Sequence, residues 1–374
     1  MKHHFNYFLF FLVVFILSFS MVFLACLSAS ASLQKFGNTH YFIFNQLINA
    51  LIALVFALIA YFVPLTFWKK WAPFLLFLNL IAMFFVFIPG IGIKAGGASR
   101  WFSIGFTSVQ PSEFLKITSI LYLSAWIASK LSDTNMSSWK SIAKNGYHNF
   151  VYIFAPFFVF LGVIFGTLYL QSDASTMGII TLTLLALYFS AKTPLWHTLC
   201  IIAGGLSIVL FMVKFEPYRL SRWFVFLNPD ADPLGQGYQL RQSIISLGSG
   251  GFFGKGLGMS TQKFGYLPEA MTDSIFAIIG EEFGFIGTSI VVLVFILFFW
   301  LGINIAKKST DQFSKMTAIG IVVWIILQAF INITSTIGFF PITGVPLPFF
   351  TYGGSHLVAE LFAIGLLLNI SKNK

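Results

Sequence analysis

Ten apolar runs, most of them close to the length of a membrane crossing, set the strongest limit on how this chain can fold. About 20 apolar residues span a bilayer as a helix, and in lipid only helices and closed barrels satisfy every backbone polar group. The predicted spans are residues 5–27, 42–63, 72–89, 113–129, 150–170, 177–190, 196–213, 274–305, 314–333 and 356–370. We therefore predict an all-α polytopic membrane protein of about ten transmembrane helices, folded as a single membrane domain over residues 1–374.

The composition argues against a soluble protein. Of the 374 residues, 57% are hydrophobic and only 9% are charged, which is unlike a soluble globular domain. The net charge of +10 comes without a basic stripe on a soluble face, so anionic lipid is a better partner than nucleic acid. Cys26 and Cys200 lie in apolar runs without metal-ligand spacing, so neither a disulfide framework nor a zinc site is predicted.

The first apolar run has two interpretations. Lys2, His3 and His4 precede it, and a Ser-Ala-Ser-Ala sequence follows it, as in a secretory signal peptide. The run covers residues 5–27, whereas an ordinary signal core has roughly 7 to 15 residues. An uncleaved first transmembrane helix is therefore the favoured interpretation.

The connections between the spans alternate in charge. The short loops on one side are nearly bare, and the other side carries Lys2, Lys69, Lys70, Lys130, Lys140, Lys144, Lys192, Lys307, Lys308, Lys315, Lys372 and Lys374. Since short cytoplasmic loops carry the excess of Lys and Arg, both termini are predicted to be cytoplasmic, in a multi-pass protein of the cytoplasmic (inner) membrane. Residues 90–112, 171–176, 214–273 and 334–355 then face outward, and 214–273 is a large extracytoplasmic loop between the seventh and eighth helices.

Two outward-facing segments place charges beside apolar spans. Glu113 and Lys116 are three residues apart at a predicted helix start, so they share a face. They form either a local ion pair on a capped helix or a charged wall of an outward-facing cavity. Asp173 ends another span on the same side; taken alone it is interpreted as a solvated loop acid.

The long loop combines cations with a glycine series. Its cations are Arg219, Arg222, Arg241, Lys255 and Lys263. Glycines from Gly248 to Gly258 permit close backbone approach, and successive N–H groups can hold an anion. The series lacks Walker A spacing, so the motif is weak alone, but with arginines beside it an outer diphosphate site is predicted.

Asp273 stands at the end of this loop, where the span 274–305 begins. A charge at the mouth of a membrane bundle is costly to desolvate, so it usually has a partner or a task. The last outer loop, Pro341 to Ser355, has three prolines and no charge. Irregular backbone at membrane depth is tolerated only when it is packed in protein or lines a cavity, so this loop is interpreted as a re-entrant lid over the outer cavity.

These motifs, in this order, strongly resemble the SEDS family of bacterial wall synthesis, to which FtsW, RodA and SpoVE belong. The matching stretches begin near residue 90 and are GGASRWF, QPSEFLK, PYRL, NPDADPLGQGYQ, QSIISLGSGGFFGKGLG, LPEAMTDSIFAIIGEE and PLPFFTYGGS. The residues from Ile279 to Glu282 are more similar to FtsW, the division member, than to RodA, the elongation member. The chain departs from the family pattern at Met271 and Ser274 and in the QSDAST stretch at 171–176.

The resemblance implies a peptidoglycan glycosyltransferase that polymerises lipid II, the undecaprenyl diphosphate-linked disaccharide peptide, for septal wall synthesis in cell division. The implied partners are a class B penicillin-binding protein transpeptidase and divisome proteins. By motif, the essential acid falls on Asp273, and Arg100 and Trp101 match the first outer-loop motif. The substrate-binding residues expected from the motifs and the long loop are Arg100, Trp101, Glu113, Lys116, Asp173, Arg219, Arg241, Glu269 and Ser355.

The implied reaction assigns two tasks. A base must take the proton of the acceptor's 4-hydroxyl group, which we assign to Asp273; such catalysis contributes about 10² to 10⁴ in rate. The charge on the leaving diphosphate is offset either by Arg219, Arg241 and Lys116 or by a divalent cation, Mg or Mn. No other cofactor is expected. Direct displacement inverts the donor's α-linkage to β.

Two other functions stay open at this point. A lipid II flippase would need an ionisable pathway across the membrane, often with broken helices, whereas the strongest polar features lie on the outer side. A non-catalytic scaffold that recruits the transpeptidase is the second alternative, if Met271 and Ser274 mark a decayed site.

Overall fold

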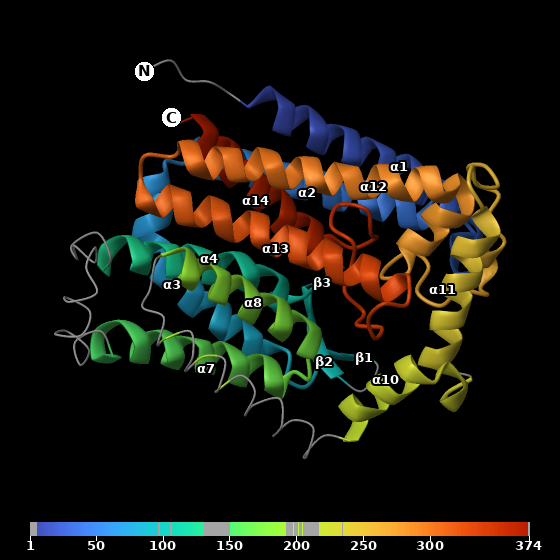
Figure 1. Ribbon diagram of the computed structural model, residues 1–374, viewed down its shortest axis with the longest axis horizontal. Coiled ribbons are helices and arrows are strands. Elements are labelled where there is room, and N and C mark those ends of the chain that lie inside the picture. Colours follow the sequence, from blue (N-terminus) through green and yellow to red (C-terminus); the bar gives the residue numbers. More distant parts are fainter. Residues whose placement is uncertain are drawn as a thin grey trace.

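The structure is a computed structural model that describes residues 6–95, 98–104, 107–130, 150–191, 197, 201, 204, 217–233 and 235–372, some of them by backbone alone. Figure 1 shows an elongated bundle whose long helices run roughly along one axis. The first turn of α1 (Tyr7–Phe36) and the last turn of α14 (Gly354–Lys372) lie at one end of the bundle. The strands and the helices α10 (Pro217–Leu227) and α11 (Gln236–Gly250) lie at the other end.

The helical class predicted from the apolar runs is confirmed. The other long helices are α2 (Tyr41–Phe62), α3 (Leu65–Phe85), α4 (Pro111–Lys130), α7 (Ala155–Leu170), α8 (Ala174–Ser190), α12 (Ile275–Lys308) and α13 (Gln312–Thr336). Among the described residues, six helices (α1, α2, α3, α12, α13 and α14) are long and apolar enough to cross a membrane, and α7 and α8 are shorter apolar helices. A π-helical turn, Phe150–Phe154, precedes α7. The predicted span 196–213 lies almost wholly outside the described residues, so the number of crossings stays a prediction.

Two helices begin or end at other residues than predicted. Helix α3 begins at Leu65, after Pro64 in extended conformation, instead of at residue 72. Lys69 and Lys70 are therefore in its first turns and not in a connection. Helix α1 continues past residue 27 to Phe36 and ends at Gly37, whose left-handed conformation lets its N–H reach the carbonyl of Leu33.

The connection between α3 and α4 folds into a small sheet that the apolar pattern did not predict. Strands β1 (Gly92–Ala95), β2 (Ala98–Ile104) and β3 (Thr107–Val109) pair antiparallel in this order. Ile93 is paired with Trp101, and Phe102 with Val109. Phe102 is buried and its ring meets that of Phe85 edge-on at 6.1 Å, which fixes the sheet on the end of α3.

The predicted long loop is largely helical over its described residues, which corrects the expectation of a polar loop. It contains α10 and α11, joined by the 3₁₀ turn Pro229–Ala231, and a further 3₁₀ turn at Gln262–Phe264. In Figure 1, α11 lies across the end of the bundle. Ile244 and Ile245 are exposed on α11, which is a surface helix of 15 residues and not a long apolar span.

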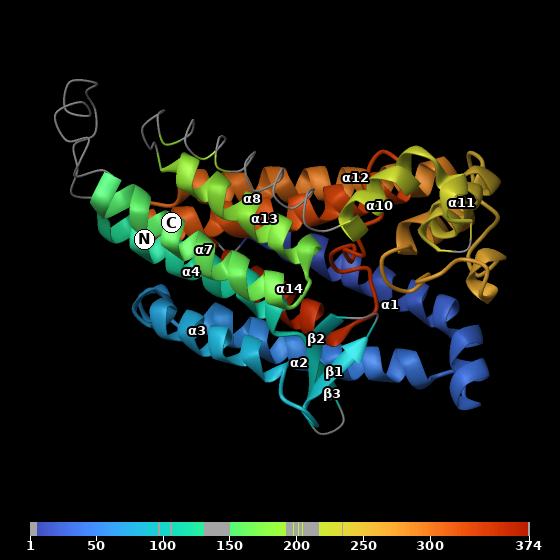
Figure 2. The ribbon, with the colours of Figure 1, turned by 90° about the horizontal axis from the view of Figure 1, so that it is seen from below.

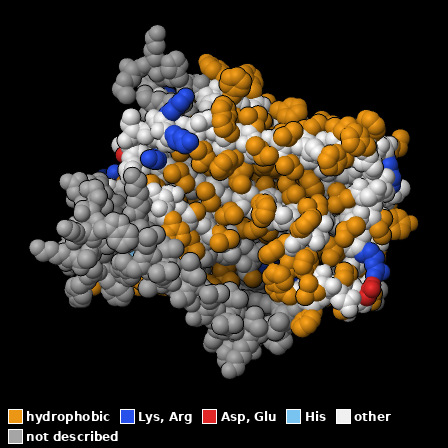
Figure 3. Space-filling view, in the orientation of Figure 1, with side chains coloured by type: hydrophobic (Ala, Val, Ile, Leu, Met, Phe, Trp, Pro, Cys, Tyr) orange, Lys and Arg blue, Asp and Glu red, His pale blue; other side chains and the backbone are white. Residues whose placement is uncertain are grey.

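The centre of the bundle is formed by α13 and α14. Burial differs between the helices in their most apolar stretch of 18 residues. Of these residues, 83% are buried in α14 and 61% in α13, whereas only 11% are buried in α2. Helix α2 therefore faces outward along most of its length although it packs on α14. Figure 3 shows apolar side chains over the middle of one face, with Lys and Arg near its two ends, as expected for a protein that spans a bilayer.

Candidate active site

Asp273 lies between α11 and the first turn of α12. A side chain of α11 and the side chain of the preceding residue both donate hydrogen bonds to its carboxylate. The Nε2 group of Gln239, on α11, donates to Oδ2 of Asp273 at 3.3 Å and to Oγ of Ser274 at 3.0 Å. The hydroxyl of Thr272 donates to Oδ1 of Asp273 at 3.2 Å. The side chain of Asp273 is half-buried, so the carboxylate is oriented by neighbours and still accessible.

The backbone of Asp273 is fixed by the irregular segment, residues 337–353, which joins α13 to α14. Nδ2 of Asn332, on α13, donates to the carbonyls of Asp273 at 2.8 Å and Val345 at 2.7 Å. The N–H of Tyr352 donates to the carbonyl of Met271 at 2.9 Å. A Cβ atom on Gly344 would lie 3.8 Å from Oδ2 of Asp273. The irregular segment therefore lies directly against the carboxylate.

The second half of the irregular segment is packed in protein, with Val345, Leu347, Phe349 and Phe350 buried, whereas Phe339 and Phe340 near its start are exposed. Figure 2 shows this segment, in red, between the sheet and the helices α10 and α11. This placement agrees with the rule that irregular backbone at membrane depth is packed in protein or lines a cavity.

Glu269 is a second carboxylate close to Asp273. It has a positive φ of 51°, which turns the chain so that the Thr272 hydroxyl can also donate to its Oε2 at 2.8 Å. Burial and, after it, the negative charge of Glu269 raise the pKa of Asp273 from 3.8 to about 6, although the hydrogen bonds from Gln239 and Thr272 oppose the rise. The carboxylate of Asp273 is thus poised to exchange a proton near neutral pH.

Glu113 and Lys116 form an ion pair of 2.7 Å inside the bundle, with 4% and 3% of their surfaces exposed. The local ion pair is therefore present, but it is buried and not on a solvated helix face. Lys116 Nζ also donates to Oε1 of Gln328, on α13, at 3.0 Å, and it lies 5.3 Å from the ring centre of Trp324.

The polar contacts continue from this ion pair to the irregular segment. Nε2 of Gln328 donates to the carbonyl of Pro346 at 3.1 Å and to Oε1 of Glu360, on α14, at 3.4 Å. Oε2 of Glu360 accepts the N–H of Phe349 at 2.8 Å. Gln328 and Asn332, one turn apart on α13, therefore both support the segment that lies on Asp273. The sequence motifs did not point to Gln328, Asn332 and Glu360, although polar residues inside apolar spans often mark functional sites.

Asp173 is buried, which corrects its interpretation as a solvated loop acid. Its Oδ1 accepts the N–H of Thr176 at 3.3 Å, so it caps α8, and its Oδ2 accepts the hydroxyl of Ser112 at 3.2 Å. The hydroxyl of Ser175 donates to the carbonyl of Thr343 at 2.5 Å. The irregular segment thus has the Asp173 region on one side and Asp273 on the other.

The other predicted residues of the first and last outer loops join the same region. An Nη2 group of Arg100 donates to the carbonyl of Ser172 at 2.5 Å. The hydroxyl of Ser355 accepts the N–H of Gln110 at 3.0 Å. Trp101 is half-buried in the sheet, opposite Ile93. These contacts tie the sheet, α8 and α14 together at the mouth of the bundle.

The structure does not bring Arg241 to Asp273. Arg241 pairs with Asp230, and both side chains are largely exposed. Gln239 and Arg241 are two positions apart on α11, or about 200° around the helix, so they face opposite ways. For Arg219 the structure describes the backbone but not the side chain. Contact of Arg219 or Arg241 with a diphosphate stays a prediction.

The glycine series serves close packing against α12. A Cβ atom on Gly254 would lie 2.2 Å from the carbonyl oxygen of Glu282, and one on Gly250 would lie 1.9 Å from that of Gly280. Helix α12 is interrupted at Gly284, which has φ 66° and ψ −159°. The N–H of Gly258 donates to Oε2 of Glu282 at 2.8 Å. The loop amide therefore already holds an anion, a carboxylate of this chain.

Two of the predicted loop cations neutralise this part of α12. Lys255 Nζ lies 2.6 Å from Oε1 of Glu281, and Lys263 Nζ lies 3.7 Å from Oε1 of Glu282. Glu281 also accepts the hydroxyls of Ser260 and Thr261. Lys255 and Lys263 thus support the fold of the outer loop. They are not available to a diphosphate in this arrangement.

Within the described part of the chain, no group of three or more His, Cys, Asp or Glu residues could hold a metal ion. The pair of Asp273 and Glu269, with the Thr272 hydroxyl between them, is a smaller donor set. Mg²⁺ is typically held by one or two carboxylates together with substrate phosphates, so these residues fit a divalent cation that arrives with a diphosphate.

Fold and site together define a polytopic membrane protein with a carboxylate-centred site at one mouth of its helical bundle. The family model of FtsW, RodA and SpoVE, described as cell cycle protein, matches residues 7–374. The chain belongs to this family.

Curated relatives and solved structures agree with this membership. The chain is 39% identical over 363 residues to a probable peptidoglycan glycosyltransferase FtsW of Trichlorobacter lovleyi, covering 96% of this chain and 91% of that protein. It is 35% identical over 360 residues to stage V sporulation protein E of Bacillus subtilis, covering 96% and 94%. A solved chain from a peptidoglycan synthase complex has the same fold, with a TM-score of 0.76, 22% identity, and coverage of 98% and 97%. RodA of Thermus thermophilus matches with a TM-score of 0.69, 20% identity, and coverage of 98% and 96%.

Proposed function

We propose that this protein is a peptidoglycan glycosyltransferase that polymerises lipid II at the outer face of the cytoplasmic membrane, for septal wall synthesis in cell division. The observation that carries the proposal is the Asp273 carboxylate, half-buried, held by Gln239 and Thr272, and with its pKa raised to about 6. The names of the relatives, FtsW and stage V sporulation protein E, support it.

Asp273 acts as the general base in this proposal. It accepts the proton of the acceptor sugar's 4-hydroxyl group while the oxygen attacks the anomeric carbon of the donor, and the bond to undecaprenyl diphosphate breaks. A base with a pKa slightly below the working pH is mostly ionised and still basic enough to take part, and the pKa of Asp273 is raised to about 6. A single displacement of this kind inverts the anomeric configuration.

The charge of the leaving diphosphate is offset by a divalent cation or by cationic side chains. Asp273 and Glu269 would hold a Mg²⁺ or Mn²⁺ ion, which supplies Lewis-acid stabilisation of the diphosphate when bound. Arg219, Arg241 and Arg100 are the cationic side chains of the outer region proposed for the same task. Lys116 is buried with Glu113, so it supports the irregular segment and not the diphosphate.

We propose that both termini lie in the cytoplasm and that Asp273 faces the outside. The support is the lysine distribution, with Lys307, Lys308 and Lys372 at the end of the bundle opposite Asp273. Cysteines at Phe253, 78% exposed, and at Lys308 test this topology in a variant without Cys26 and Cys200. An impermeant maleimide should label position 253 in intact spheroplasts and position 308 only after lysis; the reverse pattern contradicts it.

The proposed partners are a class B penicillin-binding protein and other divisome proteins. The solved relative that is part of a peptidoglycan synthase complex supports a transpeptidase partner.

A lipid II flippase is the second candidate, because α12 is broken at Gly284 and the ionisable residues Glu113, Lys116 and Glu360 are buried in the bundle. Purified protein, with and without its penicillin-binding protein, should make glycan chains from lipid II. Transfer of labelled lipid II across liposomes without chain synthesis would favour the flippase. Neither activity, with retained partner binding, would favour a scaffold.

A further inference from the structure

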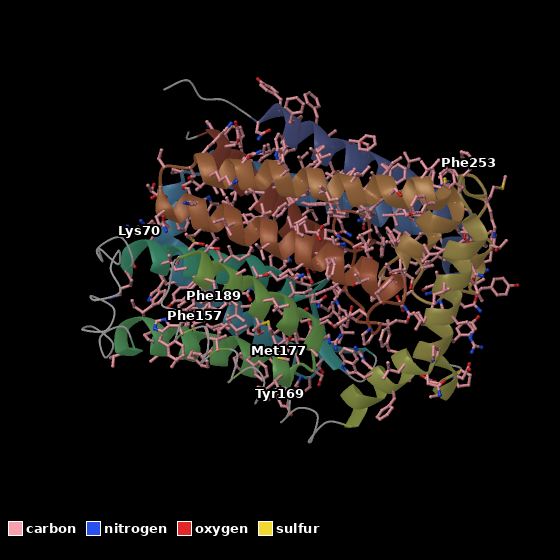
Figure 4. The ribbon with its side chains drawn as sticks, viewed as in Figure 1. Lys70, Phe157, Tyr169, Met177, Phe189 and Phe253 are labelled. Atoms are coloured by element: carbon pink, nitrogen blue, oxygen red, sulfur yellow. The ribbon has the colours of Figure 1, made fainter. Side chains whose placement is uncertain are left out.

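A groove of about 490 Å³ lies between α3 and α4, at the end of the bundle opposite Asp273. Its lining residues are Thr66, Lys69, Lys70, Pro73, Tyr122, Ala125, Trp126 and Ser129. Figure 4 places Lys70 at this end, with Phe253 at the other. None of these residues has a role in the proposed glycosyltransferase site.

The groove is built from two matching helix faces. On α3, Thr66, Lys69 and Lys70 are followed by Pro73, at positions i, i+3, i+4 and i+7, which form one face of a helix. On α4 the lining residues have the same spacing, from Tyr122 to Ser129. The small side chain of Ala125, between the rings of Tyr122 and Trp126, leaves the hollow open.

The groove is cationic, and none of its lining residues in the described part of the chain is acidic. Lys69 is half-buried and Lys70 is exposed. Neither lysine takes part in an ion pair among the described residues. The lysines lie near the N-terminus of α3, which is the positive end of the helix dipole. Because the first turn of α3 has no acidic residue, this positive potential is not neutralised there and adds to the charge of the lysines.

Aromatic side chains on α3 place the groove at the level of lipid headgroups. Phe67, Trp71 and Phe74 are 42%, 41% and 49% exposed. The rings of Trp71 and Phe74 are 5.4 Å apart. Tryptophan on the outer surface is typical of the boundary between hydrocarbon and headgroups. Because Lys69 and Lys70 are in the same turns of α3 as Trp71, we infer that they lie at the level of the bilayer phosphates.

The backbone of α3 adds a hydrogen-bond acceptor to the groove. Pro73 has no N–H, so the carbonyl of Lys69, four residues earlier, lacks its usual helical partner at that position. A carbonyl beside two lysines suits a headgroup that carries both a phosphate and a hydroxyl group.

We propose that the groove between α3 and α4 binds an anionic phospholipid of the leaflet opposite Asp273, with its phosphate at Lys69 and Lys70 and its upper acyl chain against Tyr122, Ala125 and Trp126. A zwitterionic headgroup fits less well because its cation would meet two lysines and no carboxylate. Basic pockets between transmembrane helices bind anionic headgroups in other membrane proteins. The proposed topology makes this leaflet the cytoplasmic one; the binding itself does not depend on glycosyltransferase activity.

Lipid retention by the purified full-length protein tests the proposal. Dioleoyl-phosphatidylglycerol and dioleoyl-phosphatidylcholine are titrated separately into the detergent-solubilised protein, and bound lipid is counted by native mass spectrometry. Each lysine near an anionic surface contributes roughly a factor of five in affinity. The double variant Lys69→Gln/Lys70→Gln should therefore bind phosphatidylglycerol about 30-fold more weakly than the wild type.

Two comparison variants separate the groove from surface charge in general. Lys307→Gln/Lys308→Gln removes an adjacent pair of exposed lysines at the same end, on α12, and should bind like the wild type. Ala125→Trp fills the groove, keeps both lysines and should lose the bound lipid. Lys69→Arg/Lys70→Arg should retain it.

Four results would overturn the proposal. They are equal loss in the two Gln pairs, wild-type binding by Ala125→Trp, equal retention of phosphatidylcholine, and displacement of the lipid by millimolar inorganic phosphate, which would indicate a site for free anions. Melting temperatures provide an independent measurement. Phosphatidylglycerol should raise the melting temperature of the wild type and of the Lys307/Lys308 variant, and should not raise that of the Lys69/Lys70 variant.

Discussion

Gln239 and Asp273, 34 residues apart, are joined by a hydrogen bond of 3.3 Å from Nε2 to Oδ2. The bond connects α11 to the start of α12 and brings the outer loop onto the carboxylate. A donor to the ionised form of an acid lowers its pKa. Gln239 therefore helps to keep Asp273 deprotonated despite its burial.

Gln239→Ala should raise the pKa of Asp273 above about 6. Because the base must be ionised, the acidic limb of the pH–rate profile should move to higher pH, on the order of half a unit. Lipid II polymerisation measured from pH 5 to 9 checks this shift. Gln242→Ala, on the same helix, is the control and should not shift the acidic limb of the pH–rate profile. Equal profiles in both variants would show that Gln239 does not influence the pKa of Asp273.

Glu269→Gln should have the opposite effect. Its negative charge raises the pKa of Asp273, so its removal makes the ionised form of Asp273 easier to reach. The acidic limb should move to lower pH, on the order of half a unit to one unit. A limb that stays in place would show that the two carboxylates are not coupled. If Glu269 also holds a divalent cation, the concentration of Mg²⁺ needed for half-maximal rate should rise in this variant.

Breaking the buried pair of Glu113 and Lys116 should destabilise the protein. Lys116→Met leaves Glu113 buried without its partner at 2.7 Å, a change that typically costs about 3 to 5 kcal/mol. The double variant Lys116→Met/Glu113→Gln should recover part of this loss, because no unpaired charge remains at these two positions. Melting temperatures in detergent check the expected order of stability, which is wild type, then the double variant, then Lys116→Met. A double variant less stable than Lys116→Met would contradict this order.

Gly254→Ala should destabilise the packing of the outer loop on α12. The new Cβ atom would lie 2.2 Å from the carbonyl oxygen of Glu282, at a φ of 81°, so backbone must move, at a cost of about 2 to 4 kcal/mol. Gly37 is the control, since it has a left-handed conformation (φ 67°, ψ 7°) and no atom within 4 Å of its Cβ position. Gly37→Ala should cost only about 1 kcal/mol. Equal melting temperatures would show that the loop does not pack closely on α12.

The apolar runs predicted the helices well because lipid permits few other structures. The same reasoning could not predict the sheet, whose strand β2 contains Arg100 and Trp101, or α10 and α11, whose apolar residues lie on surface helices outside the long spans. The position of Asp273 between a loop and a span, together with the motif resemblance, pointed to this residue.

The partners of Asp273 could not be predicted, because they come from distant segments. Gln239 and Asn332 reach it from α11 and α13, and no spacing in the sequence relates them. The glycine series was interpreted as a site for phosphate because glycines serve anion nests and close packing equally well. The structure shows that these glycines serve packing, because Glu282 lies against Gly254 and accepts the N–H of Gly258.

The central claim is that the Asp273 carboxylate takes the acceptor proton. Asp273→Asn keeps the size of the side chain and removes the proton acceptor, so the variant should insert, melt near the wild-type temperature and bind the penicillin-binding protein. Chain synthesis from purified lipid II is the direct measurement, with Asp230→Asn, which removes an exposed carboxylate from the outer loop, as the control. Asp273→Asn should lose about 10² or more in rate, and Asp230→Asn should make near-normal chains. Near-normal synthesis by stably folded Asp273→Asn would contradict the role of Asp273 as the base.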